Sequence, residues 1–135
     1  ARFSPALNRR AGELLAELTG GKYDKVALTQ QFEALAEEHD GLQPRRALTL
    51  SQGTADQLYL AVRLAVCELV LPAEEPCPLV LDDALANFDD SRCALALEAL
   101  ARLGEERQIL LFTCHSREAR LAEGREGAAV LRLQS

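Results

Sequence analysis

The fold is decided by Leu50-Ser51-Gln52-Gly53-Thr54-Ala55-Asp56-Gln57, read together with Pro78-Leu79-Val80-Leu81-Asp82-Asp83 further along the chain. The first segment is a Ser-x-Gly turn that opens a long apolar helix, which we expect over 54–71. The second segment is a short apolar strand that ends in two adjacent carboxylates. A continuous apolar strand of this kind is typical of a parallel sheet that is covered on both faces.

Composition limits the classes of protein that this chain can belong to. Its 135 residues fit one domain with a real core, and 48% of them are hydrophobic while 27% are charged. The 21 acidic residues outnumber the 15 basic ones, which gives a net charge of -6. Phosphate binding needs clustered positive charge, so this balance argues against a nucleic-acid clamp made of this chain alone.

Cysteine and histidine usage is sparse. Four cysteines stand at positions 67, 77, 93 and 114, no two of them form a Cys-x-x-Cys pair, and histidine occurs at 39 and 115 only. This spacing argues against a zinc site and against a disulfide framework, and it predicts a reducing cytoplasm. The longest apolar run, 58–71, contains Arg63 and Glu68 and is too short for a membrane span. We therefore expect no membrane partner.

Hydrophobic periodicity and turn residues predict the order of the elements. Helical spacing begins at residue 4 and stops at Thr19-Gly20-Gly21, and Asp40-Gly41 supplies the turn of a hairpin within 32–48. Thr54-x-x-Gln57 is a candidate capping box for the long apolar helix. The expected helices are 4–18, 54–71, 91–103 and 116–122, and the other expected strands are 23–28, 79–81, 109–113 and 128–133. Strands alternate with helices from residue 78 onward, which predicts an α/β sheet.

Asp82 and Asp83 are the first candidates for chemistry. They follow a buried strand at its carboxyl end, where open α/β sheets bind ligands. Two adjacent carboxylates repel each other unless a cation or a proton lies between them, and Mg²⁺ on nucleotide phosphates is such a cation. The second carboxylate can then orient or deprotonate an attacking water. An ordinary solvated Asp-Asp turn explains the pair equally well at this point.

Two further sites carry polar groups suited to phosphate. The unpaired N–H groups at a helix N-terminus bind phosphate, Gly53 permits a close approach and Ser51 offers a hydroxyl. His115 follows the strand 109–113 and can donate to a γ-phosphate oxygen from the sheet edge where Asp82 lies. Each feature alone has a plainer explanation: a capped helix for Ser51, a polar loop for His115, and a helix cap for Asp89.

As an ordered set, these segments resemble the C-terminal lobe of an SMC-like ABC ATPase head. Residues 50–61 resemble the ABC signature helix, 78–83 the Walker B strand, 86–89 the D-loop and 112–115 the switch-histidine loop. Leu18-Thr19-Gly20-Gly21-Lys22-Tyr23 resembles the point where the coiled-coil arm re-enters the head in SbcC-type and YhaN-like ATPases. The resemblance covers roughly residues 10–133.

The resemblance implies a fold and a division of the chain. The expected fold is the C-terminal lobe of a P-loop NTPase-like head, with a mostly parallel sheet flanked by helices, an N-terminal helix and a small β-hairpin. Residues 1–135 form one domain in this interpretation. Residues 1–20 are the end of a coiled-coil arm, 21–50 are strands, and 51–135 hold the signature helix, Walker B strand, D-loop and switch histidine.

The resemblance also implies roles at the strand ends. Asp82 corresponds to the residue that holds the Mg²⁺ shell. Asp83 stands where many members carry a catalytic Glu, so the base is shorter here and the turnover rate is in question more than nucleotide binding. His115 corresponds to the residue that senses the γ-phosphate of ATP.

The remaining implied roles concern a second head. In this family ATP is bound between two heads, so hydrolysis requires a dimer. Ser51 and Gly53 correspond to residues that contact the γ-phosphate of the nucleotide held by the other head. Gln57 lies just inside the signature helix as a further nucleotide-binding candidate, and Asp89 corresponds to a residue that crosses the head–head interface.

No Gly-x-x-x-x-Gly-Lys-Ser/Thr phosphate loop occurs in these 135 residues. The family places that loop in an N-terminal Walker A lobe beyond a long coiled coil, so we expect this chain alone to lack ATPase activity. The expected partners are that lobe and a second head in a homodimer, with DNA and a nuclease subunit in repair or chromosome maintenance. Two alternatives remain open: a non-catalytic ABC-like dimerisation or scaffold module, and a transporter-type nucleotide-binding subunit.

Overall fold

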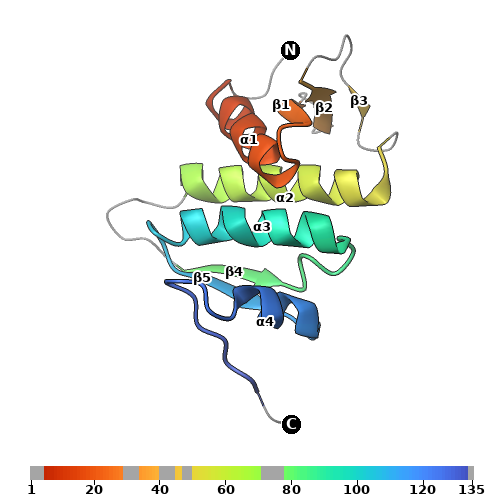
Figure 1. The fold of residues 1–135 in the computed structure, drawn as a ribbon. Coiled ribbons are helices and arrows are strands. Elements are labelled where there is room, and N and C mark those ends of the chain that lie inside the picture. The colour runs from red at the N-terminus through yellow and green to blue at the C-terminus, as the bar shows by residue number, and fades with distance from the viewer. Residues whose placement is uncertain (1–4, 29–33, 40–44, 47–49, 71–77, 134–135) are drawn as a thin grey trace.

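The computed structural model describes residues 5–28, 34–39, 45–46, 50–70 and 78–133. Figure 1 shows α1 and a small antiparallel sheet at one end, two long helices in the middle, and a parallel strand pair with a short helix at the other end. The elements follow one another as α1 (Pro5–Leu18), β1 (Tyr23–Leu28), β2 (Ala34–Glu38), β3 (Arg45–Arg46), α2 (Gln52–Val70), β4 (Leu79–Asp82), α3 (Asp90–Leu103), β5 (Ile109–Phe112) and α4 (Ser116–Ala122).

The N-terminal third forms as its local sequence predicts. α1 ends before Gly20 and Gly21, which adopt φ values of +63° and +89° that glycine takes without steric cost. β1 pairs antiparallel with β2, and β2 pairs antiparallel with β3. The expected strand 23–28 and the paired strands of the expected hairpin are confirmed, while its Asp40-Gly41 turn lies outside the described residues.

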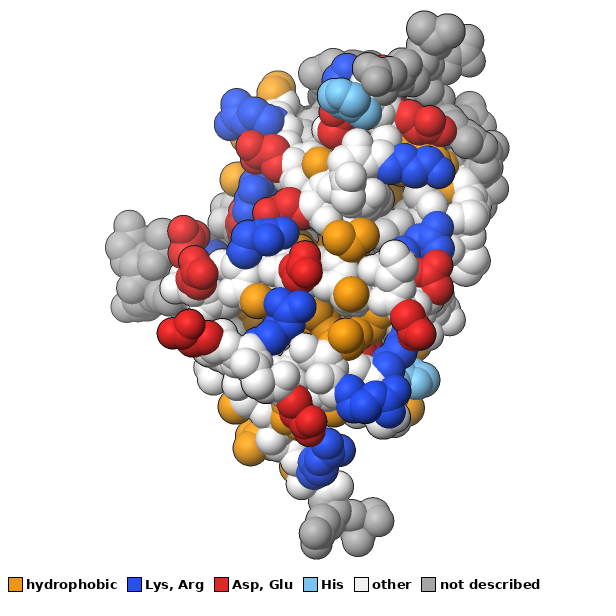
Figure 2. Space-filling view, viewed as in Figure 1, with side chains coloured by type: hydrophobic (Ala, Val, Ile, Leu, Met, Phe, Trp, Pro, Cys, Tyr) orange, Lys and Arg blue, Asp and Glu red, His pale blue; other side chains and the backbone are white. Residues whose placement is uncertain are grey.

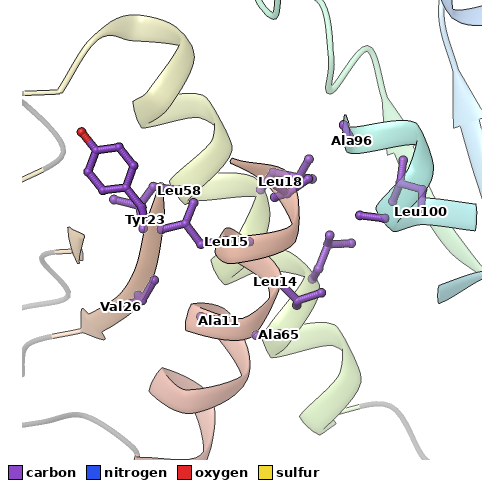
Figure 3. Packing of buried hydrophobic residues seen from close by; sticks show 14 of the residues in the cluster. Ala11, Leu14, Leu15, Leu18, Tyr23, Val26, Leu58, Ala65, Ala96 and Leu100 are labelled. Carbon is purple, nitrogen blue, oxygen red and sulfur yellow. The ribbon is translucent and has the colours of Figure 1, made fainter. Parts of the chain in front are cut away.

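The core lies where α1 meets α2, α3 and β1. Figure 3 shows Leu14, Leu15 and Leu18 of α1 directed among side chains of the neighbouring elements, including Leu58 and Leu100. All three α1 leucines are fully excluded from solvent, and each contributes about 1.5–3 kcal/mol by burial. Buried alanines on each of the three helices allow close approach: Ala11, Ala61, Ala65, Ala96 and Ala99.

α2 differs from the expectation in two respects. It begins at Gln52, and its first turn is capped by Ser51, whose Oγ accepts a hydrogen bond of 3.2 Å from the backbone N–H of Thr54. The predicted capping box at Thr54 is therefore wrong, because Thr54 lies within the first turn. Burial on all sides is also wrong, since Tyr59 is 53% exposed and Leu69 is 52% exposed.

β4 and β5 form the parallel pair that the sequence predicts, with Leu81 opposite Leu111 and Asp82 opposite Phe112. A mostly parallel sheet is not found in the described residues, where a separate sheet, β1-β2-β3, is antiparallel. Burial of β4 and β5 on both faces is wrong as well. Alternate side chains reach the core, but the opposite face stays exposed at Val80, Leu110 and Phe112.

The expected closing strand over 128–133 does not form, and this prediction is wrong. A strand needs a hydrogen-bonding neighbour, and no described strand pairs with this segment. Leu131 and Leu133 are each 85% exposed as a result. In the described ranges, no helix combines the length and apolar character needed to cross a bilayer.

Candidate functional site

The carboxyl ends of β4 and β5 bring Asp82, Asp83 and His115 to one edge of the parallel pair. Asp82 is the last residue of β4 and is exposed. The next residue, Asp83, donates its backbone N–H to the carbonyl of Phe112 at 2.7 Å, and its Oδ1 lies 3.5 Å from Nε2 of His115. Three of the predicted site residues therefore share one edge, as parallel strand pairing requires.

Asp83 has an unusual backbone. Its φ is +55°, and it is the one described non-glycine residue with a positive φ. Aspartate tolerates this left-handed region better than most residues, yet the conformation still carries a cost, and such costs cluster at functional sites. The turn directs the Asp83 carboxylate toward the loop that follows β5.

That loop is fixed by a group that the sequence analysis missed. The hydroxyl of Thr113 accepts a 3.0 Å hydrogen bond from the backbone N–H of His115 and donates to the carboxylate of Glu118. Glu118 is only 2% exposed, although it lies in the first turn of a seven-residue helix. A Thr after a strand is a recognisable turn signal, because its side chain can bond to the backbone N–H two residues on, but nothing in the local sequence marks Glu118 as buried.

A second cluster surrounds the N-terminus of α2. The Ser51 hydroxyl donates to Oγ1 of Thr54 at 2.9 Å, and Thr54 also accepts from Nη2 of Arg92 at 3.3 Å. A Cβ on Gly53 would lie 2.9 Å from Nη1 of Arg92. The absence of a side chain at Gly53 therefore lets a guanidinium from α3 rest against the first turn of α2, beside Ser51.

Gln57 and Asp89 complete this cluster from two elements. Gln57 is 2% exposed, and its side chain donates to the carbonyl of Leu18 at 2.7 Å and accepts from Nε of Arg92 at 3.2 Å. Asp89 caps α3 through the backbone N–H of Arg92 and pairs with Nη1 of the same residue at 2.7 Å. A pocket of about 240 Å³ opens here, lined by Thr19, Lys22, Tyr23, Thr54, Gln57, Asp89, Ser91, Arg92 and Leu95.

The segment between the two clusters is held to both. Leu85 and Phe88 are buried and anchor it to the core. Arg117 of α4 donates to the carbonyl of Leu85 at 2.9 Å and contacts the carboxylate of Asp90 at 3.2 Å. The segment that carries Asp89 is therefore tied at one end to Arg92 and at the other to the helix that follows His115.

Sequence reasoning missed Arg92 and Arg117, the two cations that join these elements. An Arg three residues after a capping Asp is a detectable i,i+3 signal for Arg92. Its contacts with α2 are not detectable, since they join residues 35 and 38 positions apart in the chain. Figure 2 shows basic and acidic side chains interspersed across one face, without a continuous basic patch on that face.

The chain resembles known proteins in sequence and in fold. It is 38% identical to the uncharacterized protein YhaN of Bacillus subtilis over 112 residues, which is 82% of this chain and 12% of that protein. It is 37% identical over 65 residues to an uncharacterized protein of Mycobacterium tuberculosis, which is 48% of this chain and 7% of that protein. The chain thus spans a small part of the curated relatives it matches. No family model matches the sequence.

Solved structures settle the fold. The SMC head domain of Thermotoga maritima matches with a TM-score of 0.70 over 90% of this chain and 42% of that one, at 16% identity. A structure from work on ATP-driven dimerization and DNA-stimulated activation of SMC ATPases also matches at 0.70, over 91% of this chain and 80% of that one, at 19% identity. The chain has the fold of the C-terminal lobe of an SMC-like ATPase head.

An SMC head bound to the C-terminal winged-helix domain of ScpA is a further match, with a TM-score of 0.66 over 91% of this chain and 40% of that one, at 20% identity. Identities this low establish a shared fold and not shared residues. In the SMC-like lobe, the two polar clusters occupy the strand ends and the N-terminus of α2. The roles of their residues must be argued from their own chemistry.

Proposed function

We propose that this SMC-like lobe forms part of an ATPase head that binds and hydrolyses ATP between two heads, in DNA repair or chromosome maintenance. The observation that carries the proposal is the pairing of Asp83 with His115 at 3.5 Å beside Asp82. A carboxylate base, a metal-binding carboxylate and an imidazole at the ends of adjacent parallel strands can together assist phosphoryl transfer to water.

The donors at this edge fit Mg²⁺. Mg²⁺ takes oxygen ligands and keeps several waters, so one exposed carboxylate at Asp82 together with nucleotide phosphates suits it. When bound, the ion neutralises charge on the β- and γ-phosphates. In this proposal Asp82 binds the ion and Asp83 acts on the attacking water.

The other two groups act on the attacking water and the γ-phosphate. The Asp83 carboxylate accepts a hydrogen bond from the water and orients it for attack. His115 donates from its imidazole to the γ-phosphate, and the hydrogen bond from its backbone N–H to Thr113 fixes the loop that carries it. The polar contacts of Glu118 and Phe112 keep both groups in position before ATP arrives.

The second cluster serves the nucleotide of the opposite head. Ser51 is exposed at the N-terminus of α2, where unpaired N–H groups and the helix dipole attract a γ-phosphate. Gly53 leaves room for the guanidinium of Arg92, which adds positive charge beside this helix end. Asp89 is exposed beside them and would reach across the head–head interface, whereas Gln57 would contribute to nucleotide binding by holding Arg92.

The partners follow from what the described surface leaves uncovered. The face formed by Val80, Leu110 and Phe112 is apolar, and Phe112 lies next to the proposed catalytic loop. We assign this face to an N-terminal Walker A lobe, and we assign residues 1–20 to the end of a coiled-coil arm. YhaN is far longer than this chain, which leaves room in such a protein for both parts.

The test is reconstitution. The chain is co-expressed with a Walker A lobe encoded by the same gene, and ATP-dependent dimerisation and hydrolysis are measured for the wild type and for Asp83→Asn. We expect the variant to accumulate dimers in ATP and to lose hydrolysis, while the 135-residue chain alone hydrolyses nothing. Asp24→Asn is the matched control, because Asp24 lies in β1 and its carboxylate pairs with His39, which belongs to neither cluster.

Three results would overturn the proposal or part of it. If the gene encodes no phosphate loop, the proposed ATPase activity is excluded. Unchanged hydrolysis in Asp83→Asn removes the role of Asp83. An assembled wild-type head that dimerises but never hydrolyses ATP favours the alternative, a non-catalytic dimerisation or scaffold module, for which the shorter Asp83 in place of Glu is the supporting feature.

A further inference from the structure

Asp83, Cys114 and His115 converge at the ends of β4 and β5. One ligand atom from each residue, a carboxylate oxygen, a sulfur and an imidazole nitrogen, lies within 4.8 Å of the other two. A mixed oxygen, sulfur and nitrogen set is unsuited to Mg²⁺, which takes oxygen, but it matches the ligands of Zn²⁺ and related ions. Sequence spacing misses this group, because Asp83 follows β4 whereas Cys114 and His115 follow β5.

The backbone fixes the three positions in advance. Asp83 is tied to the end of β5 by its 2.7 Å hydrogen bond to Phe112, and its positive φ turns it toward the loop. Residues 113–115 are held by Thr113, which bonds to the backbone of His115 and to the buried carboxylate of Glu118. Such supporting hydrogen bonds orient metal ligands before the metal binds.

The side chains need only small movements to reach a bound ion. Zn²⁺–ligand bonds of about 2.0–2.3 Å in a tetrahedron place the ligand atoms about 3.3–3.8 Å apart. The Asp83–His115 pair already lies at 3.5 Å, and Cys114 is exposed, so rotation of its side chain can supply the remaining approach. A plain ion pair between Asp83 and His115 is the competing explanation, and it gives Cys114 no role.

We propose that Asp83, Cys114 and His115 bind a divalent transition metal ion of the Zn²⁺ class, with the fourth position open to water. Metal binding itself is independent of the proposed ATPase function. The effect of the bound ion on activity rests on that function. The ion occupies the carboxylate and the imidazole assigned to hydrolysis, so it inhibits the head. Cys114 makes the inhibition specific for thiophilic ions.

The direct test uses Co²⁺ as a spectroscopic substitute for Zn²⁺ on the purified chain, with a non-thiol reductant and circular dichroism to confirm folding. We expect one equivalent of Co²⁺ to produce tetrahedral visible bands and a sulfur-to-cobalt charge-transfer band, both abolished by one equivalent of Zn²⁺. Cys114→Ser is expected to remove the charge-transfer band and weaken binding by roughly tenfold or more, since loss of a ligand costs at least as much as loss of its support.

Cys67→Ser and Cys77→Ser are the matched controls and are expected to bind like the wild type. An unchanged spectrum in Cys114→Ser, or an equal loss in either control, overturns the proposal and leaves the ion pair as the explanation. The reconstituted head gives a second readout with Mg²⁺ in excess. Zn²⁺ that binds at this site yet fails to inhibit hydrolysis keeps the metal site and refutes the catalytic roles of Asp83 and His115.

Discussion

Replacing Gln57 with alanine is expected to destabilise this chain by about 2–4 kcal/mol. The carbonyl of Leu18 is among the last four of α1, which have no partner within the helix, and the Gln57 side chain supplies one at 2.7 Å. Leaving that buried carbonyl unpaired costs about 1–3 kcal/mol. Removing one buried methylene and the contact with Arg92 adds about 1 kcal/mol.

Gln52→Ala is the matched control for this prediction. Gln52 lies five residues earlier on the same helix and is exposed, and its side-chain amide donates to the carboxylate of Asp56 at 2.9 Å. Its replacement is expected to change the free energy of unfolding by about 0.5 kcal/mol or less. Comparing the two substitutions separates the buried hydrogen bond from any general effect of removing a glutamine from α2.

The assay is urea unfolding followed by circular dichroism, with stability taken from the midpoint and the slope. Gln57→Leu fills most of the same volume without a donor, and we expect it to retain the loss of about 1–3 kcal/mol that belongs to the Leu18 carbonyl. Equal stability of Gln57→Ala and Gln52→Ala would refute the reasoning. The role of Gln57 would then rest on nucleotide binding, to be measured in the assembled head.

Three other substitutions probe the clusters and the core beside them. The stability of Gly53→Ala in urea unfolding is expected to stay within about 1 kcal/mol of wild type, because improved helix propensity offsets displacement of Arg92. ATP-dependent dimerisation of the reconstituted head is expected to fall, and normal dimerisation would contradict this. Asp83→Ala is expected to be less stable than Asp83→Gly by about 1–2 kcal/mol, because glycine accepts the positive φ without cost; equal midpoints would exclude strain. Burial raises the pKa of the Cys93 thiol, so it stays protonated near neutral pH and its contribution to stability declines as the pH rises through the thiol range; a thiol-exchange reagent should show a fast phase that Cys114→Ser reduces by one equivalent and Cys93→Ser leaves unchanged.

Local signals account for the elements that the sequence predicted well. The strand over 23–28 was predicted to the residue, and the helix over 4–18 within one residue, because an apolar stripe ends at two glycines that take the left-handed conformation. The pairing of β4 with β5 followed from their alternation with helices. It placed Asp82 and His115 at one edge, which is the part of the candidate site that topology alone determines.

Apart from the helix start at Thr54, the errors concern which surfaces of an element are covered by a partner. Apolar composition predicted that α2 and β4 would be covered on every side, yet Tyr59 and Val80 are exposed in the described part of the molecule. The segment 128–133 carries a strand-like pattern but pairs with no described strand. Apolar composition shows that the surface of an element is suited to being covered. It does not identify the covering partner, which is not encoded in the same stretch of sequence.

Buried polar groups explain how the exposed site residues are held. The buried polar residues of the described chain are Asn8, Thr54, Gln57 and Glu118. Burying such groups is costly unless they are hydrogen-bonded, so each must support something that an apolar residue cannot. Thr54 bonds with Ser51, Gln57 holds the cation beside Asp89, and Glu118 supports the loop before His115 through Thr113.

Three of the four therefore lie directly behind residues of the two proposed clusters. The fourth, Asn8, accepts the backbone N–H of Leu28 at 3.0 Å and supports β1. Polar burial concentrated behind two exposed turns suits preorganised binding of a charged ligand, because each turn must keep its geometry before the ligand arrives.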